Sequence, residues 1–222
     1  MAPAPSPEVP CRERFVAASD CERVRSGLVT QPVNTATSLA YVVAGVALAA
    51  CGRRRPRTAL LGPVARALVL NGVGSVAYHG PGGRWGKWLH DTGLVAMSAT
   101  LAVAALARVR DWEDRRVHVA DAALVAAGAG ALAVRPGVEL AFVAPLGIVA
   151  VGHELVRPSP SGRGRRLVGG ALLTVGAVVQ ARSRTGGPWC RPDGPFHGHG
   201  LWHLLSAAGL YLVADASVAD AG

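Results

Sequence analysis

The sequence predicts an all-helical integral membrane protein, a bundle of seven transmembrane helices. Half of its 222 residues are hydrophobic and only 17% are charged, whereas a soluble domain of this length needs a more polar surface. The hydrophobic residues also gather in blocks of about 16–21, close to the ~20 that a helix needs to cross a bilayer. Small residues are abundant, with 28 glycines in the chain, and they favour close helix packing in lipid.

Seven hydrophobic segments follow a polar tail at residues 1–33. They lie at about 35–51, 59–79, 89–107, 117–134, 139–156, 165–181 and 199–216. Residues 34–217 are therefore predicted to form one transmembrane domain, and residues 218–222 a short C-terminal tail. The fourth to sixth segments carry few polar residues, so we expect them to serve as packing helices. The polar tail lacks the pattern of a cleaved signal peptide, and we expect the first segment to direct insertion.

Lysine and arginine in the loops predict an outer N-terminus and a cytoplasmic C-terminus. The loops after the first, third and fifth segments hold four each, and those after the second, fourth and sixth hold two, one and three. The N-terminal tail also holds four, which weakens the contrast. The net charge of +9 comes from arginines in short loops, which we interpret as setting the orientation of the protein in the membrane. We therefore expect no nucleic-acid partner. The excess of arginine over a single lysine suggests a GC-rich bacterial genome and hence a bacterial plasma membrane.

This orientation places polar side chains from four segments at one level, near the outer face of the membrane. They are Asn34 and Ser38 in the first segment, Ser75 and His79 in the second, Asp91 in the third, and His199 and His203 in the seventh. Within each pair the two residues are four apart, so they share one face of a helix. Four of the five tryptophans fall on the same side, as interfacial anchors do.

The three histidines predict a catalytic zinc site near the outer leaflet. His199 and His203 have the spacing with which metalloproteases hold zinc, and His79 as a third ligand leaves one tetrahedral position for water. Zinc lowers the pKa of such a water to about 7. We expect Asp91 to orient this water and accept its proton, and Ser75 to donate a hydrogen bond to the oxyanion. These roles suit hydrolysis of an amide or ester.

Each residue also has a simpler interpretation. Ser75 fits a small packing residue beside two glycines, Asp91 fits an N-terminal helix cap, and a lone histidine fits a hydrogen bond to a neighbouring backbone. Asn34 and Ser38 fit interhelical hydrogen bonds, and we place them around the metal ligands. For the whole set, the rival functions are a receptor with a structural metal, an ion or proton transporter, and a non-catalytic scaffold. Ionisable groups are costly to bury in a membrane, which favours a functional role.

Three cysteines fall on the predicted outer side, where disulfides persist. A Cys21–Cys190 bridge would join the tail to the loop before the seventh segment. Cys11–Cys190 and Cys11–Cys21 are open alternatives. Cys51 lies near the cytoplasmic end of the first segment.

The motifs, taken in order, resemble the alkaline ceramidase family, part of a wider group of seven-helix membrane hydrolases that includes the adiponectin-receptor-like proteins. The matching residues of the later helices are Gly74-Ser75-x-x-x-His79, Asp91, and His199-x-x-x-His203 followed by Leu204-Leu205-Ser206. Two further motifs, Asp20-Cys21-Glu22 and Gln31-Pro-Val-Asn34-Thr-x-x-Ser38-x-x-Tyr41, resemble the family's tail and first helix. The resemblance implies a zinc-dependent amidase that cleaves a ceramide-like N-acyl lipid. It implies His79, His199 and His203 as ligands and places Tyr41 with the residues around them.

The resemblance also implies a calcium site in the tail of animal members. Asp20 and Glu22 match that site, whereas Val24 stands about where an asparagine is expected and Gln31 replaces a glutamate. Fewer carboxylates weaken a site for a hard cation, so we do not expect tight calcium binding. The expected partner is a membrane lipid that reaches the zinc sideways between helices, and no obligate protein partner is inferred.

Overall fold

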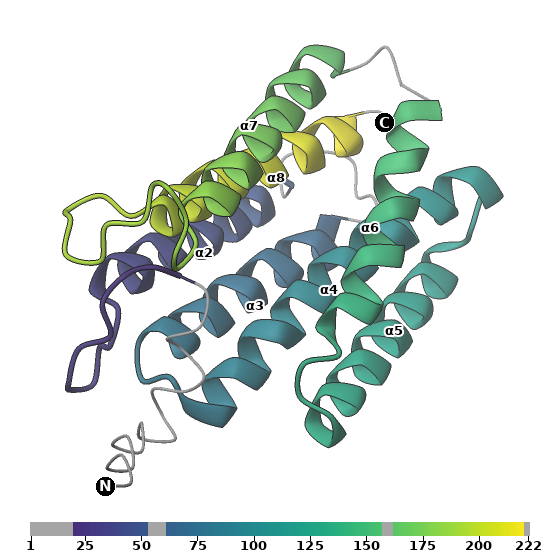
Figure 1. Ribbon diagram of the computed structural model, residues 1–222. Coiled ribbons are helices and arrows are strands. Elements are labelled where there is room, and N and C mark those ends of the chain that lie inside the picture. The colour runs from purple at the N-terminus through teal and green to yellow at the C-terminus, as the bar shows by residue number, and fades with distance from the viewer. Residues whose placement is uncertain (1–19, 53–60, 157–161, 220–222) are drawn as a thin grey trace, which may run out of the picture.

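The computed structural model describes residues 20–52, 61–156 and 162–219, and within these ranges the chain is helical and contains no strand. The helices are α2 (Pro32–Gly52), α3 (Leu61–His79), α4 (Gly83–Arg110), α5 (Asp114–Val134), α6 (Glu139–Val156), α7 (Arg163–Arg182) and α8 (Gly198–Ala219). Their axes run roughly along one common direction (Figure 1). The predicted all-helical class and the seven helices are confirmed in this part of the chain.

Three of the described helices are long and apolar enough to cross a membrane. They are Pro32–Cys51 within α2, all of α4 and all of α5, while α6 contains a shorter apolar stretch. This is fewer than the seven spans predicted. Helices α3, α7 and α8 carry polar residues such as Asn71 and His203. These side chains are buried inside the bundle, but they still lower the mean hydropathy of their helices. The seven-span arrangement therefore stays a prediction.

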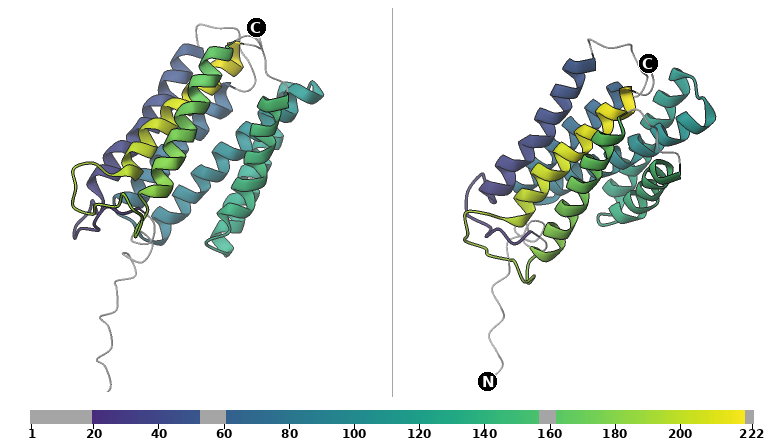
Figure 2. Two further views of the ribbon diagram at one scale, coloured as in Figure 1. Left: turned by 45° about the horizontal axis from the view of Figure 1, so that its top comes forward. Right: turned by 90° about the horizontal axis from the view of Figure 1, so that it is seen from above.

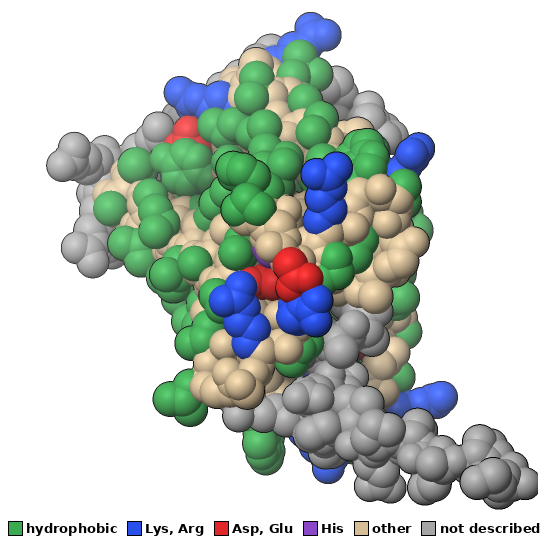
Figure 3. Space-filling model, turned by 60° about the vertical axis from the view of Figure 1, so that its left-hand side comes forward, with side chains coloured by type: hydrophobic (Ala, Val, Ile, Leu, Met, Phe, Trp, Pro, Cys, Tyr) green, Lys and Arg blue, Asp and Glu red, His purple; other side chains and the backbone are tan. Residues whose placement is uncertain are grey.

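Large hydrophobic side chains remain exposed on the outside of the helices. Val43 of α2 is 66% exposed, Ile148 of α6 72% and Leu167 of α7 63%. Figure 3 shows one face on which hydrophobic side chains cover much of the upper and left parts, with a cluster of acidic and basic side chains near the centre. Exposed apolar surface of this extent marks contact with a partner or a membrane, which agrees with the candidate spans.

Helix α3 lies between α2 and α4, and the rest of the bundle extends from this trio. Helix α8 packs against α2 and α7, and α5 and α6 pack against α4. The two sides, α7 with α8 and α5 with α6, are separate in the left view of Figure 2. Glycines permit the close approach of α3: a Cβ at Gly72 would lie 2.8 Å from the backbone nitrogen of Val42, and one at Gly74 would collide with the carbonyl oxygen of Leu89.

The structure moves the start of α4 upstream of the predicted third segment, from about residue 89 to Gly83. The turn Gly80-Pro81-Gly82 ends α3, and residues 84–88 are mainly polar or aromatic, so hydrophobicity alone places them outside the third segment. Asp91 is therefore an interior residue of α4, about 12 Å along the helix from its start. The alternative of Asp91 as a helix cap is wrong, because the capping position is Gly82.

Candidate metal centre

Three buried histidines meet where the end of α3 lies beside the start of α8. His79 is 0% exposed, His199 7% and His203 2%, and one nitrogen atom from each lies within 4.8 Å of the others. The ring centroids are 4.4 to 5.2 Å apart. The predicted convergence of these residues, which we call the histidine cluster, is confirmed.

The position of His79 is fixed by the turn that ends α3 and by residues far upstream. The last carbonyl groups of a helix need partners outside it. Here the Thr30 hydroxyl and backbone N–H donate to the carbonyl oxygens of His79 and Gly80 at 2.9 to 3.0 Å, and the Gln31 N–H donates to His79 at 2.9 Å. The tail segment, residues 20–31, thus caps α3 and positions His79.

The side chain of Gln31 determines which nitrogen of His79 carries the proton. Its Nε2 donates to the backbone carbonyl of Glu22 at 3.0 Å, which fixes the amide orientation, because that carbonyl only accepts. Its Oε1 lies 2.6 Å from His79 Nδ1. Nδ1 must then be the donor, and the Nε2 of a neutral His79 carries a lone pair.

The same logic holds for the other two histidines. His199 Nδ1 lies 2.8 Å from Gln180 Oε1 and 3.3 Å from Asp20 Oδ1. His203 Nδ1 lies 3.1 Å from Thr37 Oγ1, and that hydroxyl has a carbonyl acceptor for its own proton, the backbone of Val33 at 2.8 Å. Each ring therefore donates from Nδ1 and keeps an unprotonated Nε2, as metal-bound histidines do.

The Nε2 atoms of His79 and His199 are 3.2 Å apart. Two lone pairs at this distance repel each other unless a proton or cation lies between them. A tetrahedral zinc ion with bonds of about 2.0–2.1 Å places neighbouring ligand nitrogens about 3.3 Å apart. The donor set and this spacing therefore fit zinc, although three histidines are compatible with other transition metals as well.

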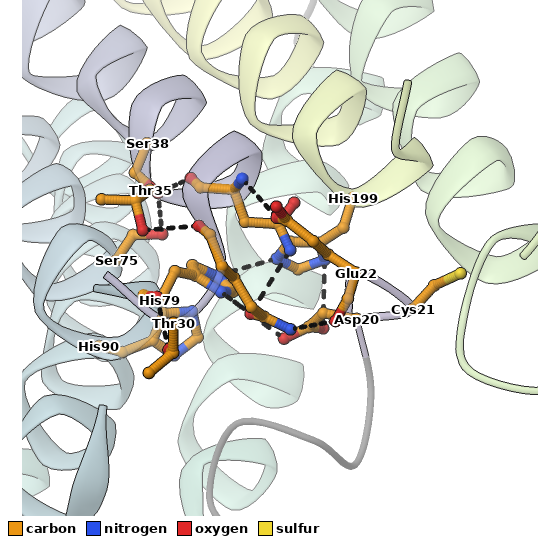
Figure 4. Close-up of polar contacts among 12 residues, drawn as sticks. Asp20, Cys21, Glu22, Thr30, Thr35, Ser38, Ser75, His79, His90 and His199 are labelled. Carbon is orange, nitrogen blue, oxygen red and sulfur yellow. Dashed lines mark hydrogen bonds and ion pairs between the residues drawn. The ribbon is translucent and has the colours of Figure 1, made fainter. Parts of the chain in front are cut away.

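The predicted supporting residues of α2 and α3 lie around the histidine cluster (Figure 4). Ser75 Oγ lies 3.4 Å from His203 Nε2 and 2.8 Å from Ser38 Oγ. Ser38 donates to the carbonyl oxygen of Asn34 at 2.6 Å, so Ser75 is the donor in the hydrogen bond between the two serines. The Tyr41 ring lies 5.8 Å from that of His203, and its hydroxyl lies 2.5 Å from Ser206 Oγ.

Asp91 lies level with Ser75 along the bundle, as predicted, but its carboxylate faces a different side. Gly74, beside Ser75, packs on the backbone of Leu89, so this turn of α4 is level with Ser75. The Asp91 carboxylate receives hydrogen bonds from Lys87 at 2.6 and 2.9 Å and lies 3.0 Å from His90 Nδ1. The His90 ring is 6.1 Å from that of His79. The His90 side chain thus lies between Asp91 and the histidine cluster.

The tail segment is fastened to the bundle by the predicted disulfide between Cys21 and Cys190, whose Cα atoms are 5.5 Å apart. Cys11, the alternative partner, lies outside the described residues. Both carboxylate oxygens of Glu22 accept backbone N–H groups of Val33 and Asn34, at 2.9 and 2.8 Å, so Glu22 caps α2. Asp20 faces His199. The calcium site implied for these two residues stays a prediction.

Sequence reasoning missed the residues that orient the histidines. The sequence-based interpretation assigns Gln31 only to a replaced position of a calcium site and Asp20 only to a calcium ligand. Gln180 and Thr37 were not considered. One signal was present for Gln180, which is a polar residue near the outer end of a predicted membrane segment.

No protein-family model matches the chain, and no curated protein matches it. The resemblance to alkaline ceramidases therefore depends on the motif residues alone and stays a prediction.

Proposed function

We propose that this chain is a zinc-dependent membrane hydrolase that cleaves the amide bond of a ceramide-like N-acyl lipid, releasing a fatty acid and an amine. The observation that carries the proposal is the convergence of three buried Nε2 lone pairs at the end of a helical bundle. His79, His199 and His203 would hold the metal. Zinc bound there would polarise the substrate carbonyl and lower the pKa of a water ligand to about 7.

The side chains around the metal ligands have distinct tasks in this proposal. Gln31, Gln180 and Thr37 hold the three imidazoles by their Nδ1 protons. Ser75 would exchange its hydrogen bond to Ser38 for one to the carbonyl oxygen of the substrate as negative charge develops there.

Asp91 would serve as the proton acceptor together with His90. Its carboxylate is already paired with Lys87, so a direct role requires that this pair opens. His90 bonds to Asp91, and its ring lies 6.1 Å from that of His79. In this proposal His90 would carry a proton from the histidine cluster to Asp91. The pair could then return the proton to the amine that leaves.

Substrate access is proposed from the bilayer. The tail segment bonds to the end of α3 and to the loop before α8, so it covers the histidine cluster at the end of the bundle. A lipid that moves sideways between helices would avoid this cover and keep its acyl chain among apolar residues. We propose the orientation predicted from the loop charges, with the cluster near the outer leaflet of a bacterial plasma membrane.

A heptahelical receptor with a structural metal is the second candidate. The pairing of Asp91 with Lys87 favours it, because no described carboxylate then stands free beside Ser75. A lipid ester or another lipid amide fits the same site as a substrate.

Turnover and metal content of three variants test the proposal. Purified wild-type protein, His203→Ala, Asp91→Ala and the exposed control His118→Ala are incubated with a panel of N-acyl lipids, and their zinc content is measured. We expect turnover to be lost in the first two variants and zinc to be lost only in His203→Ala. His118→Ala should match the wild type. Turnover that persists in both site variants rejects the hydrolase, and zinc without any turnover supports the receptor.

A further inference from the structure

A cavity of about 240 Å³ lies at the other side of α4 from the histidine cluster. The residues that line it are Arg84, Trp85, Lys87, Trp88 and Asp91 at the start of α4, Leu132 and Ala133 at the end of α5, and Pro136 in the following turn. Its volume is below the 300–1,000 Å³ typical of sites for drug-sized ligands. It therefore suits a small group, or one end of a larger molecule.

The position of this cavity in the fold places it at a membrane surface. Helices α4 and α5 are two of the three candidate spans, and the cavity lies where one begins and the other ends. Trp85 is 75% exposed, and Trp88 donates its indole N–H to the carbonyl oxygen of Ala129 at 3.0 Å. Tryptophan is enriched at the level of lipid headgroups. The neighbouring Val134 is 87% exposed, which leaves an apolar surface for an acyl chain beside the cavity.

The charges of the cavity leave one cation available. Lys87 is paired with Asp91 and lies 3.7 Å from Glu139, so two carboxylates offset its charge. Arg84 is exposed and has no ion-pair partner among the described residues. A guanidinium with free N–H groups matches phosphate, which it can bind through two parallel hydrogen bonds.

We propose that this cavity binds the headgroup of an anionic phospholipid, with the lipid phosphate on Arg84 and an acyl chain along the outside of α5. The walls formed by Trp85 and Trp88 hold the apolar part of the headgroup region. The cavity contains none of the three histidines, although Asp91 in its wall also has a role in the proposed hydrolase. Lipid binding at Arg84 is measured without turnover, so its result does not depend on the hydrolase activity.

Lipid binding to four proteins tests the proposal. Phosphatidylglycerol is titrated against detergent-solubilised wild type, Arg84→Ala, Ala133→Phe and Arg182→Ala, and bound lipid is counted by native mass spectrometry. Arg182 is the matched control, because it also lies beside a tryptophan, 5.9 Å from the Trp189 ring, but lines no part of the cavity. We expect the first lipid to bind about tenfold more weakly to Arg84→Ala, which loses a charge-assisted contact. Ala133→Phe should weaken binding by filling the cavity while Arg84 remains.

Three outcomes overturn the proposal. In the first, Arg84→Ala binds the lipid as tightly as the wild type does. In the second, Arg84→Ala and Arg182→Ala lose affinity equally, which indicates that the lipid responds to the overall surface charge and not to the cavity. Inorganic phosphate in excess could displace the lipid completely, which indicates an anion site without lipid recognition. Elution as a single species and an unchanged helical circular dichroism spectrum show that each variant is folded.

Discussion

Helices α2, α3 and α8 share a polar interior at one end and an apolar interior at the other. The polar end holds the histidine cluster with Asn34, Ser38, Ser75 and Ser206, and the apolar end holds Ala44, Leu48, Val64, Leu68 and Ala214. Side chains at both ends are almost fully buried. The two ends differ in the interactions that define their structure. Packing in the apolar end depends on the volume and shape of the side chains, whereas the polar end depends on hydrogen bonds, which are directional.

This difference has consequences for substitution. An apolar interior tolerates exchanges that conserve volume, whereas a buried polar group that loses its partner costs the desolvation of that group. Damage to the apolar end should therefore change stability and leave metal binding intact. Damage to the polar end should change metal binding with a smaller effect on stability.

Leu68→Ala should give the largest loss of stability. Leu68 is 0% exposed in the apolar end, and removing its side chain leaves a cavity that costs about 2–4 kcal/mol. Thermal unfolding in detergent measures this change. Zinc stoichiometry should remain that of the wild type, and loss of zinc in this variant would show that the two ends are not independent.

Gln31→Leu should weaken zinc binding about 10–100-fold, as loss of a group that orients a metal ligand does. Gln31→Glu is its matched control, because a carboxylate can also accept the proton of His79 Nδ1. Competition with a chelator measures both affinities. Equal affinities for the leucine variant and the wild type would mean that the Gln31 contact does not orient His79.

Tyr41→Phe tests the boundary between the two ends. It removes the hydrogen bond to Ser206 and keeps the ring contact with His203. We expect unfolding to become easier by about 1 kcal/mol, with full zinc content. A loss of zinc would assign Tyr41 to the metal centre rather than to packing.

The smallest effect should come from the exposed ion pair between Arg23 and Asp193, which fastens the tail segment. The hydrogen bond and charge of Arg23 lower the pKa of Asp193 below its ordinary 3.8. A lowered pKa stabilises the fold above pH 3.8, and this contribution disappears as the pH falls further, through the pKa of the folded state. Melting temperatures of wild type and Asp193→Asn should differ slightly above pH 3.8 and converge below it. High salt should remove the difference as well.

Sequence reasoning succeeded where local periodicity and membrane depth were sufficient. The pairs Ser75–His79 and His199–His203 follow from one helical turn, and their common level follows from segment order. The prediction for Asp91 shows the limit: it lies level with Ser75 along the bundle, but its carboxylate faces Lys87 and a cavity lined by α5. Hydrophobic patterning fixes how deep a residue lies, and the rotation of a helix against its neighbours depends on contacts far apart in the chain.

The sequence by itself determined the helical class and the seven helices of the described chain, predicted the meeting of three histidines, and gave the Cys21–Cys190 bridge as one of three possible pairings. These features follow from composition, helical spacing and the direction of each segment. Only the tertiary structure decided that Gln31 and Gln180 hold the imidazole protons, that Glu22 caps α2, and that a cavity opens beside Arg84. Each of these features depends on how closely separate segments approach one another. Glycine contacts and individual hydrogen bonds between segments set that approach, and the sequence of one segment alone does not encode it.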